Sequence, residues 1–105
     1  MRIEVTRTAA ALPDDLNTYA EYRAFLRLAA IAASVQLVQI TIKTQDEATV
    51  CLVFADLGPA GSVQSWARAA EPSRAIDVAV NRLEASIQHR LRGGLEPTPL
   101  EQPRV

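Results

Sequence analysis

The sequence has one cysteine, one histidine and one lysine, and the scarcity of cysteine and histidine excludes disulfide-stabilised and zinc-binding proteins. The lone Cys51 cannot form an intramolecular disulfide, and together with His89 it supplies no set of zinc ligands. No run of about 18 apolar residues is present to span a bilayer, and the first residues lack the apolar segment of a signal peptide. We therefore expect a soluble cytoplasmic protein that does not enter a membrane and carries neither a metal ion nor another cofactor.

Charge is nearly balanced, because 11 basic residues face 12 acidic ones and the formal net charge is -1. This balance gives no general affinity for nucleic acid, and nothing in the composition indicates DNA as a partner. Basic charge is nevertheless concentrated near the end of the chain. Residues 68–92 hold five arginines against the acidic Glu71, Asp77 and Glu84: Arg68, Arg74, Arg82, Arg90 and Arg92.

Residues 71–92 have the clearest periodicity in the chain. At roughly 100° per residue, their larger apolar side chains share one stripe. Pro72 suits a first helical turn, and Gly93 suits the left-handed position after a helix. The pattern predicts a helix that packs on a sheet with one face and offers a basic face to an anionic partner. The apolar stripe holds Ile76, Val80, Leu83, Ile87 and Leu91, and the basic side holds Arg74, Arg82, His89 and Arg92.

The first 33 residues predict a strand followed by a helix. Residues 1–6 alternate between apolar and polar, and Pro13 with two aspartates favours a helix start. We expect the core-facing stripe of that helix to contain Tyr19, Tyr22, Leu26, Ala29, Ala30 and Ala33, bordered by Arg23 and Arg27. Phe25, Leu28 and Ile31 fall outside this stripe. Either neighbouring elements or a second copy in a homodimer would cover them.

Residues 35–44, 49–56 and 62–70 predict three more strands, separated by a polar turn and by a break at Gly58, Pro59 and Gly61. The second of these strands is apolar on both faces. In the third, Trp66 and Arg68 are expected on the face away from the helices, where Trp66 would stack a base, anchor a protein partner or be covered by a neighbouring strand. The expected sheet residues beneath the helices are Ile3, Val5, Val38, Ile40, Ile42, Val50, Leu52 and Phe54.

These elements assemble into an α+β fold of the order β-α-β-β-β-α. A right-handed crossover makes the first strand parallel to its neighbour, and the short turns make the remaining strands antiparallel. The result is a two-layer sandwich with a four-stranded mixed sheet and both helices on one face. Residues 1–94 are expected to form this single domain, and residues 95–105, with three prolines, a disordered tail.

The last predicted helix resembles a known family. Ala75, Ile76 and Asp77 begin a run similar to the AIDxAVDKLE motif of the ribosome hibernation-promoting factors, also called sigma-54 modulation proteins or ribosome-associated inhibitors. The resemblance covers roughly residues 1–92 and is to the short, single-domain form. Asn81 stands where the motif has Asp, Arg82 where it has Lys, and Ser73 where the family commonly has Tyr.

The resemblance implies a stress-response regulator that docks in the decoding region of the small ribosomal subunit and inhibits translation by contacting ribosomal RNA. It also implies a protein that is not an enzyme. In this family Arg23, Arg82, His89 and Arg90 occupy basic positions that would pair with phosphates, and we add Arg27, Arg74 and Arg92 on or near the same surface.

The alternative is a diverged member that acts as a protein-interaction module without ribosome binding. Its candidate interface consists of Phe25, Leu28, Ile31 and Trp66. Catalysis is the least supported reading, because Cys51 is expected within a strand and His89 on a helix face directed away from the sheet.

Overall fold

The elements follow the predicted order in the computed structural model, which describes residues 1–8, 12–13 and 15–93. The expected tail at residues 95–105 lies outside these residues. Two short 3-10 segments, η1 and η2, join the six main elements. In chain order the elements are β1 (Arg2–Arg7), α1 (Asp15–Leu28), η1 (Ala29–Ser34), β2 (Leu37–Gln45), β3 (Ala48–Asp56), η2 (Gly58–Ala60), β4 (Ser62–Ala69) and α2 (Pro72–Leu91).

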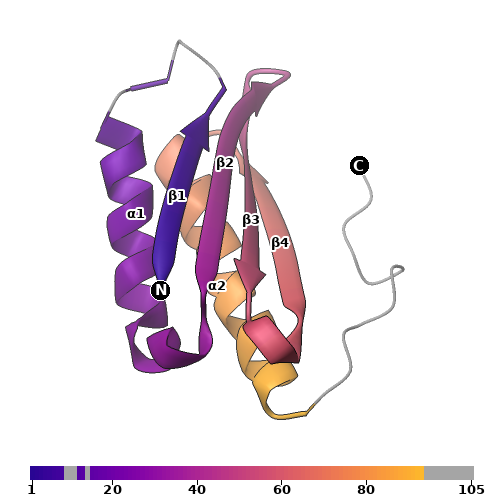
Figure 1. Cartoon of the computed structure of the whole chain (residues 1–105). Coiled ribbons are helices and arrows are strands. Elements are labelled where there is room, and N and C mark those ends of the chain that lie inside the picture. The colour runs from indigo at the N-terminus through magenta and orange to yellow at the C-terminus, as the bar shows by residue number, and fades with distance from the viewer. Residues whose placement is uncertain (9–11, 14, 94–105) are drawn as a thin grey trace.

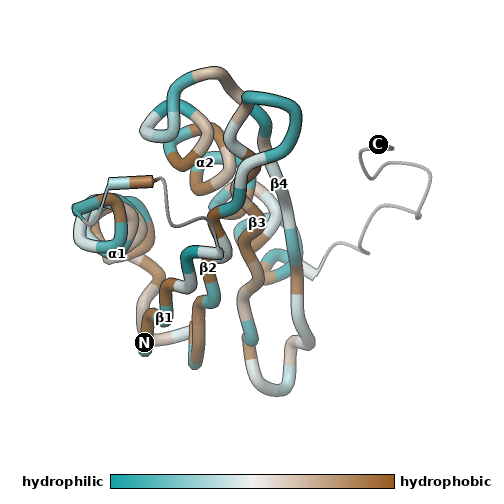
Figure 2. The backbone as a smooth tube through the Cα atoms, turned by 90° about the horizontal axis from the view of Figure 1, so that it is seen from above, coloured by the Kyte–Doolittle hydropathy of each residue, from teal (hydrophilic) through white to brown (hydrophobic). Residues whose placement is uncertain are grey.

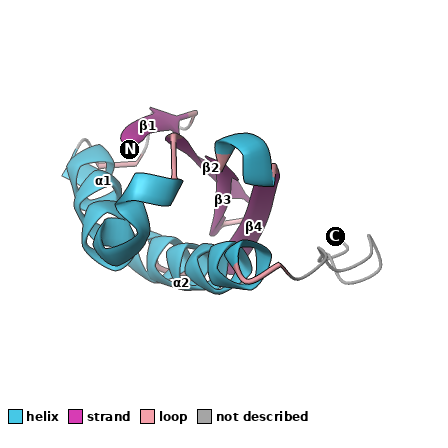
Figure 3. Cartoon of the chain, turned by 60° about the horizontal axis from the view of Figure 1, so that its bottom comes forward, coloured by secondary structure: helices cyan, strands magenta, loops and turns pink. Residues whose placement is uncertain are grey.

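The four strands form one mixed sheet in the order β1-β2-β3-β4 (Figure 1). β1 is parallel to β2, and the other neighbours are antiparallel. Both helices cover the same face of the sheet, with α2 across β3 and β4 and α1 beside β1 and against α2 (Figures 2 and 3). The predicted two-layer α+β sandwich is confirmed, and its second face is open.

The face of β3 that packs on the helices is the opposite of the predicted one. The hairpin turns tightly enough for Gln45 to pair with Ala48, and this register places Ile40 opposite Val53. The core therefore takes the odd-numbered residues of β3, whereas Leu52 on the other side is 38% exposed. Because β3 is apolar on both faces, its periodicity alone could not select the buried one. The residues that face the helices are Cys51, Val53 and Ala55, and those on the open face are Val50, which is itself buried, Leu52 and Phe54.

The core-facing stripe of α1 also differs from the prediction. Tyr22 and Leu26 are exposed, and the buried residues follow a strict four-residue spacing: Leu16, Ala20, Ala24 and Leu28. The two alanines allow α1 to lie close against α2, so small residues occupy the interface that the aromatic residues were expected to fill. The regular α-helix ends at Leu28, and a 3-10 segment with a non-helical kink at Ile31 replaces the last predicted turns.

α2 matches its prediction closely. Pro72 occupies the first turn, and Ile76, Val80, Leu83 and Ile87 are all buried. Only Leu91 departs from the predicted stripe, since it is 37% exposed in the last turn. Among the described residues, no helix is long and apolar enough to cross a membrane.

The β2–β3 turn gives a prediction about stability. Asp46 and Glu47 have φ angles of 51° and 64°, the left-handed conformation that two-residue hairpin turns require and that glycine adopts without strain. Glu47→Gly is therefore expected to raise the free energy of unfolding by about 0.5–1 kcal/mol. Urea denaturation measures the change, and Glu47→Ala, which keeps the strain, is the control. Equal stabilisation by both substitutions would show that charge, not backbone conformation, is responsible.

Candidate nucleic-acid interface

The two predicted arginines of α1 are engaged by acidic residues of α2. Arg23 Nε donates to Asp77 Oδ1 at 3.0 Å, and Arg27 Nε lies 2.9 Å from Glu84 Oε1. The hydroxyl of Tyr19 also donates to Asp77 Oδ1, at 2.7 Å. These contacts tie α1 to α2 and neutralise both arginines. Arg23 and Arg27, both predicted to bind RNA, therefore each have a carboxylate partner within the domain.

The Tyr19 contact makes stability depend on pH. The hydrogen bond to Asp77 raises the Tyr19 pKa above its usual 10.0. A raised pKa in the folded state means that the hydroxyl stabilises the fold fully below pH 10 and loses this effect as the pH rises through the folded pKa. Tyr19→Phe is expected to cost about 1 kcal/mol at neutral pH and progressively less as the pH rises from about 10 through the folded pKa.

Urea unfolding at neutral pH and at strongly alkaline pH tests this expectation. Tyr22→Phe is the matched control, because Tyr22 is 59% exposed and no hydrogen bond from its hydroxyl is present among the described residues. A cost for Tyr19→Phe that stays the same at both pH values would contradict the assigned role of Asp77.

Arg90 has a structural contact at the lower end of α2. Its Nη1 donates to the carbonyl oxygen of Ala60 in η2 at 2.9 Å, and a Cβ placed on Gly61 would lie 2.6 Å from the same nitrogen. Gly61 has a φ of 96°, which a residue with a side chain rarely adopts. Arg90 therefore fastens the turn before β4 to α2 and is half-buried there. His89, beside it, is exposed in the last turn of α2.

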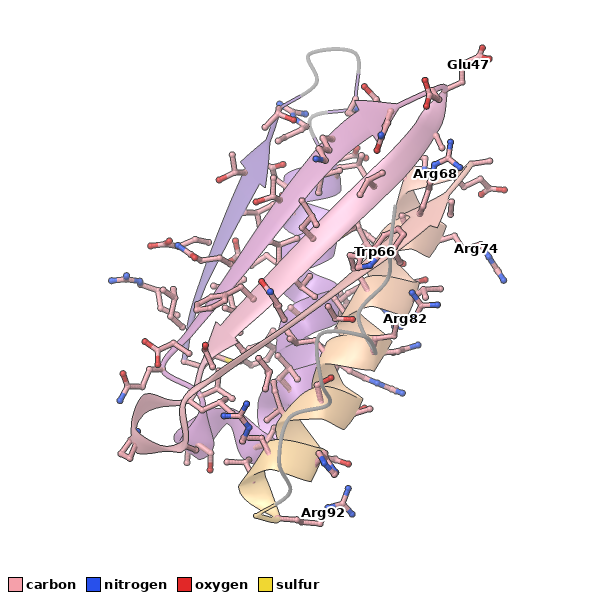
Figure 4. The ribbon with its side chains drawn as sticks, turned by 90° about the vertical axis from the view of Figure 1, so that its right-hand side faces the viewer. Glu47, Trp66, Arg68, Arg74, Arg82 and Arg92 are labelled. Carbon is pink, nitrogen blue, oxygen red and sulfur yellow. The ribbon has the colours of Figure 1, made fainter. Side chains whose placement is uncertain are left out.

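Four other arginines follow one another along the side of α2 and the neighbouring strand β4 (Figure 4). We call them the basic strip: Arg68, Arg74, Arg82 and Arg92. All four are exposed, and within the described residues none forms an ion pair. Arg82 and Arg92 donate only to main-chain carbonyl oxygens, those of Trp66 at 2.8 Å and Gln88 at 3.2 Å. Their positive charges consequently remain available to an anionic partner.

The four residues of the predicted protein interface do not form one surface in the structure. Leu28 is fully buried and Ile31 packs against the core, so the prediction that they lie outside the core-facing side of α1 is wrong. Leu28 is the last residue of the four-residue stripe of α1, and Ile31 lies at the kink of η1, after the regular helix has ended. Phe25 remains 54% exposed on the outer face of α1, and Trp66 is half-buried on the open face of the sheet.

Cys51 is a free, buried cysteine in the middle of β3. Burial raises the pKa of the Cys51 thiol to about 12, so it stays protonated and unreactive near neutral pH. Among the described residues, no group of three or more histidine, cysteine, aspartate or glutamate side chains could hold a metal ion.

No known protein-family profile matches the sequence, and no curated protein sequence matches it either. Solved structures do. A ribosomal subunit interface protein from Coxiella burnetii superposes with a TM-score of 0.76 over 88% of this chain and 99% of its own, at 14% identity. The N-terminal domain of Protein Y from Thermus thermophilus gives a TM-score of 0.70 over 85% of this chain and 98% of its own, at 21% identity. The chain has the fold of a ribosomal subunit interface protein. The family resemblance seen in the sequence of the last helix is thus confirmed at the level of the fold.

The predicted set of basic residues omitted two cations of this ribosomal interface fold. Arg68 on β4 and Lys43 on β2 both lie opposite Val50 of β3, which places them on the open face of the sheet. Within the described residues neither forms an ion pair or a hydrogen bond. Arg68 lies two residues after Trp66 in β4, so both were expected on the face of the sheet away from the helices. This spacing could have added Arg68 to the predicted basic residues.

Proposed function

We propose that the protein is a ribosome-associated translation inhibitor of the hibernation-factor type, which binds ribosomal RNA of the small subunit at the decoding region. The basic strip carries the proposal. Its four arginines have no carboxylate partner among the described residues, and they lie on one side of a fold that is shared with ribosomal subunit interface proteins. The motif resemblance in α2 supports the same function.

The length of the strip suits a phosphate backbone. Arg74 and Arg92 are separated by 18 positions of α2 and its C-terminal cap, which is about 27 Å along the helix axis. Arginine binds phosphate with a planar, multi-donor group that stays charged at every physiological pH. Such contacts position a protein on RNA by shape and charge without reading base sequence.

The proposed mechanism is occupancy of a site and involves no chemical step. A domain that lies along ribosomal RNA in the decoding region would exclude messenger and transfer RNA. A protein that binds ribosomes in this way would act in the cytoplasm, where ribosomes are found. Affinity would fall with rising salt, because each phosphate contact releases condensed counterions.

Sedimentation of the full chain with separated ribosomal subunits tests the proposal. At low salt we expect the protein to travel with the small subunit and not with the large one, and to detach as salt rises. Protein that stays at the top of the gradient at low salt, or that travels equally with both subunits, would contradict binding at the decoding region.

The outer face of α1 favours a second candidate, a homodimer. Tyr22, Phe25 and Leu26 are 59%, 54% and 48% exposed, and exposed apolar residues that cluster in this way are typical of protein interfaces. Light scattering over a concentration series would show a dimer that Phe25→Asp converts to a monomer. A strict monomer at every concentration would exclude it.

A further inference from the structure

The open face of the sheet carries a groove of about 350 Å³, whose lining includes none of the four arginines of the basic strip. Its apolar floor is formed by Leu52 and Phe54 of β3 with Trp66 of β4, and Leu52 pairs directly with Trp66 across the strands. No helix covers this face in the described part of the chain (Figure 3). The groove lies at the lower end of the size range of small-molecule sites, about 300–1,000 Å³.

The lining of the groove has polar groups of a particular kind. Gln39 and Gln64 bring side-chain amides, which can both donate to and accept from the edge of a base. Lys43 brings a positive charge that has no partner within the described residues, and no carboxylate lines the groove. The carboxylate of Glu4 lies beside the groove, where its Oε1 accepts a hydrogen bond from Gln39 Nε2 at 3.2 Å and its Oε2 pairs with Arg2 at 3.2 Å. The electrostatic character of the groove therefore favours an anionic ligand with a flat apolar part.

The groove is continuous with the basic strip. Arg68 follows Trp66 by two residues on the same face of β4, and Arg82 Nη1 donates to the carbonyl oxygen of Trp66 at 2.8 Å. Figure 4 shows Trp66 beside the strip, between Arg68 and Arg82. A strand of RNA whose phosphates lie on the strip would thus pass the edge of the groove.

We propose that this groove binds one unpaired base of an RNA strand, with the base stacked on Trp66 and held at its edges by the glutamine amides. Lys43 and Arg68 contact the flanking phosphates. Aromatic side chains on an open sheet, combined with nearby cations, bind single-stranded RNA in this way. The proposal rests on the proposed function in that RNA is the ligand. It adds a contact to a base, which the phosphate contacts of the strip do not supply.

The only tryptophan of the chain is the one in the groove, so its fluorescence reports directly on the site. We would titrate the full chain with single-stranded hexamers of adenylate and of uridylate, and with AMP alone. The hexamers are expected to quench the Trp66 emission at concentrations at least about tenfold lower than AMP does, because the hexamer also engages the strip. Absence of quenching at low salt, or equal affinity for AMP, would overturn the proposal.

Substitutions in the groove locate the binding. Phe54→Ala and Lys43→Gln are each expected to weaken hexamer binding about fivefold or more. Arg2→Gln removes one positive charge at the opposite edge of the sheet and should leave the affinity unchanged. If Phe54→Ala does not fold, Lys43→Gln alone still tests whether the groove binds the hexamer. Groove variants that bind as tightly as the wild type would overturn the proposal.

The experiments can contradict the groove proposal and the ribosomal function independently of each other. Co-sedimentation with small subunits without any quenching by hexamers would contradict the groove and leave the ribosomal function standing. Quenching that the groove variants weaken, without co-sedimentation, would support the groove and contradict the ribosomal function. Emission that changes with protein concentration but not with RNA would assign the groove to a second copy of the chain and overturn the RNA proposal.

Discussion

Replacing Arg74 and Arg82 together with glutamate is expected to weaken binding to the small ribosomal subunit by at least about 100-fold, because two charge-assisted contacts are lost and two repulsive charges are introduced. Both side chains are exposed, and neither takes part in an ion pair within the described residues. The fold should therefore persist in the variant. Co-sedimentation measures the binding, and circular dichroism with thermal unfolding checks the fold.

A matched control for this variant lies at the opposite edge of the sheet. Arg2 is an exposed arginine of β1, and Arg2→Glu makes the same change in charge per residue away from the strip. We expect Arg2→Glu to bind almost as the wild type does. Equal loss of binding in both variants would mean that overall charge, and not the strip, controls association.

Leu28→Ala is expected to lower the free energy of unfolding by about 2–5 kcal/mol, whereas Phe25→Ala should cost less than about 1 kcal/mol. The reason is that Leu28 is fully buried while Phe25 is 54% exposed. The sequence prediction places neither residue in the core-facing stripe and gives no reason for the difference. The pair of variants thus tests the orientation of α1.

Urea unfolding of both variants supplies the measurement. In a domain of this size, a loss of about 2 kcal/mol lowers the melting temperature by roughly 8–16 °C, so thermal unfolding gives an independent value. A larger cost for Phe25→Ala than for Leu28→Ala would contradict the orientation of α1 in the structure, in which Leu28 faces the core and Phe25 faces solvent.

Sequence reasoning succeeded where several local signals agreed. In α2 the apolar spacing, the proline in the first turn and the glycine after the last turn all indicate the same helix, and the structure places Ile76, Leu83 and Ile87 in the core. Agreement between independent levels of pattern is what makes an element predictable. The chain order and the single-sided packing of the helices followed from connection lengths and handedness.

The prediction for α1 failed because size was given more weight than spacing. Ala20 and Ala24 bury little area, so they attract little attention as core residues, yet their four-residue spacing from Leu16 and Leu28 is strict. Their small side chains let two helices approach each other, and that need arises only from the tertiary arrangement. Tyr22, expected in the core-facing stripe, lies at the surface for the same reason.

The buried face of β3 could have been derived from its turn. If Thr44 and Thr49 close the hairpin, Ile40 must face Val53, and the odd-numbered residues of β3 must join the core. The apolar character of the other face is then a separate observation. It marks the groove that contains Leu52 and Phe54.

The positions of the basic residues were predictable, but their availability was not. Arg23 and Arg27 were both predicted to contact RNA, yet Asp77 and Glu84 hold them across the helix interface. An ion pair between residues 54 or more positions apart depends on how two helices pack, which local periodicity does not specify. The strip that remains lies on the β4 side of α2, where Arg68 extends it.

The salt dependence of binding to small subunits tests the central claim most directly. The logarithm of the association constant should fall linearly with the logarithm of salt concentration, by about 0.7–0.9 for each phosphate contact. For the variant Arg74→Gln/Arg82→Gln we expect the slope to flatten by about 1.5, because two such contacts are removed. An unchanged slope, or wild-type binding that does not respond to salt, would contradict the claim that the basic strip binds phosphates of ribosomal RNA.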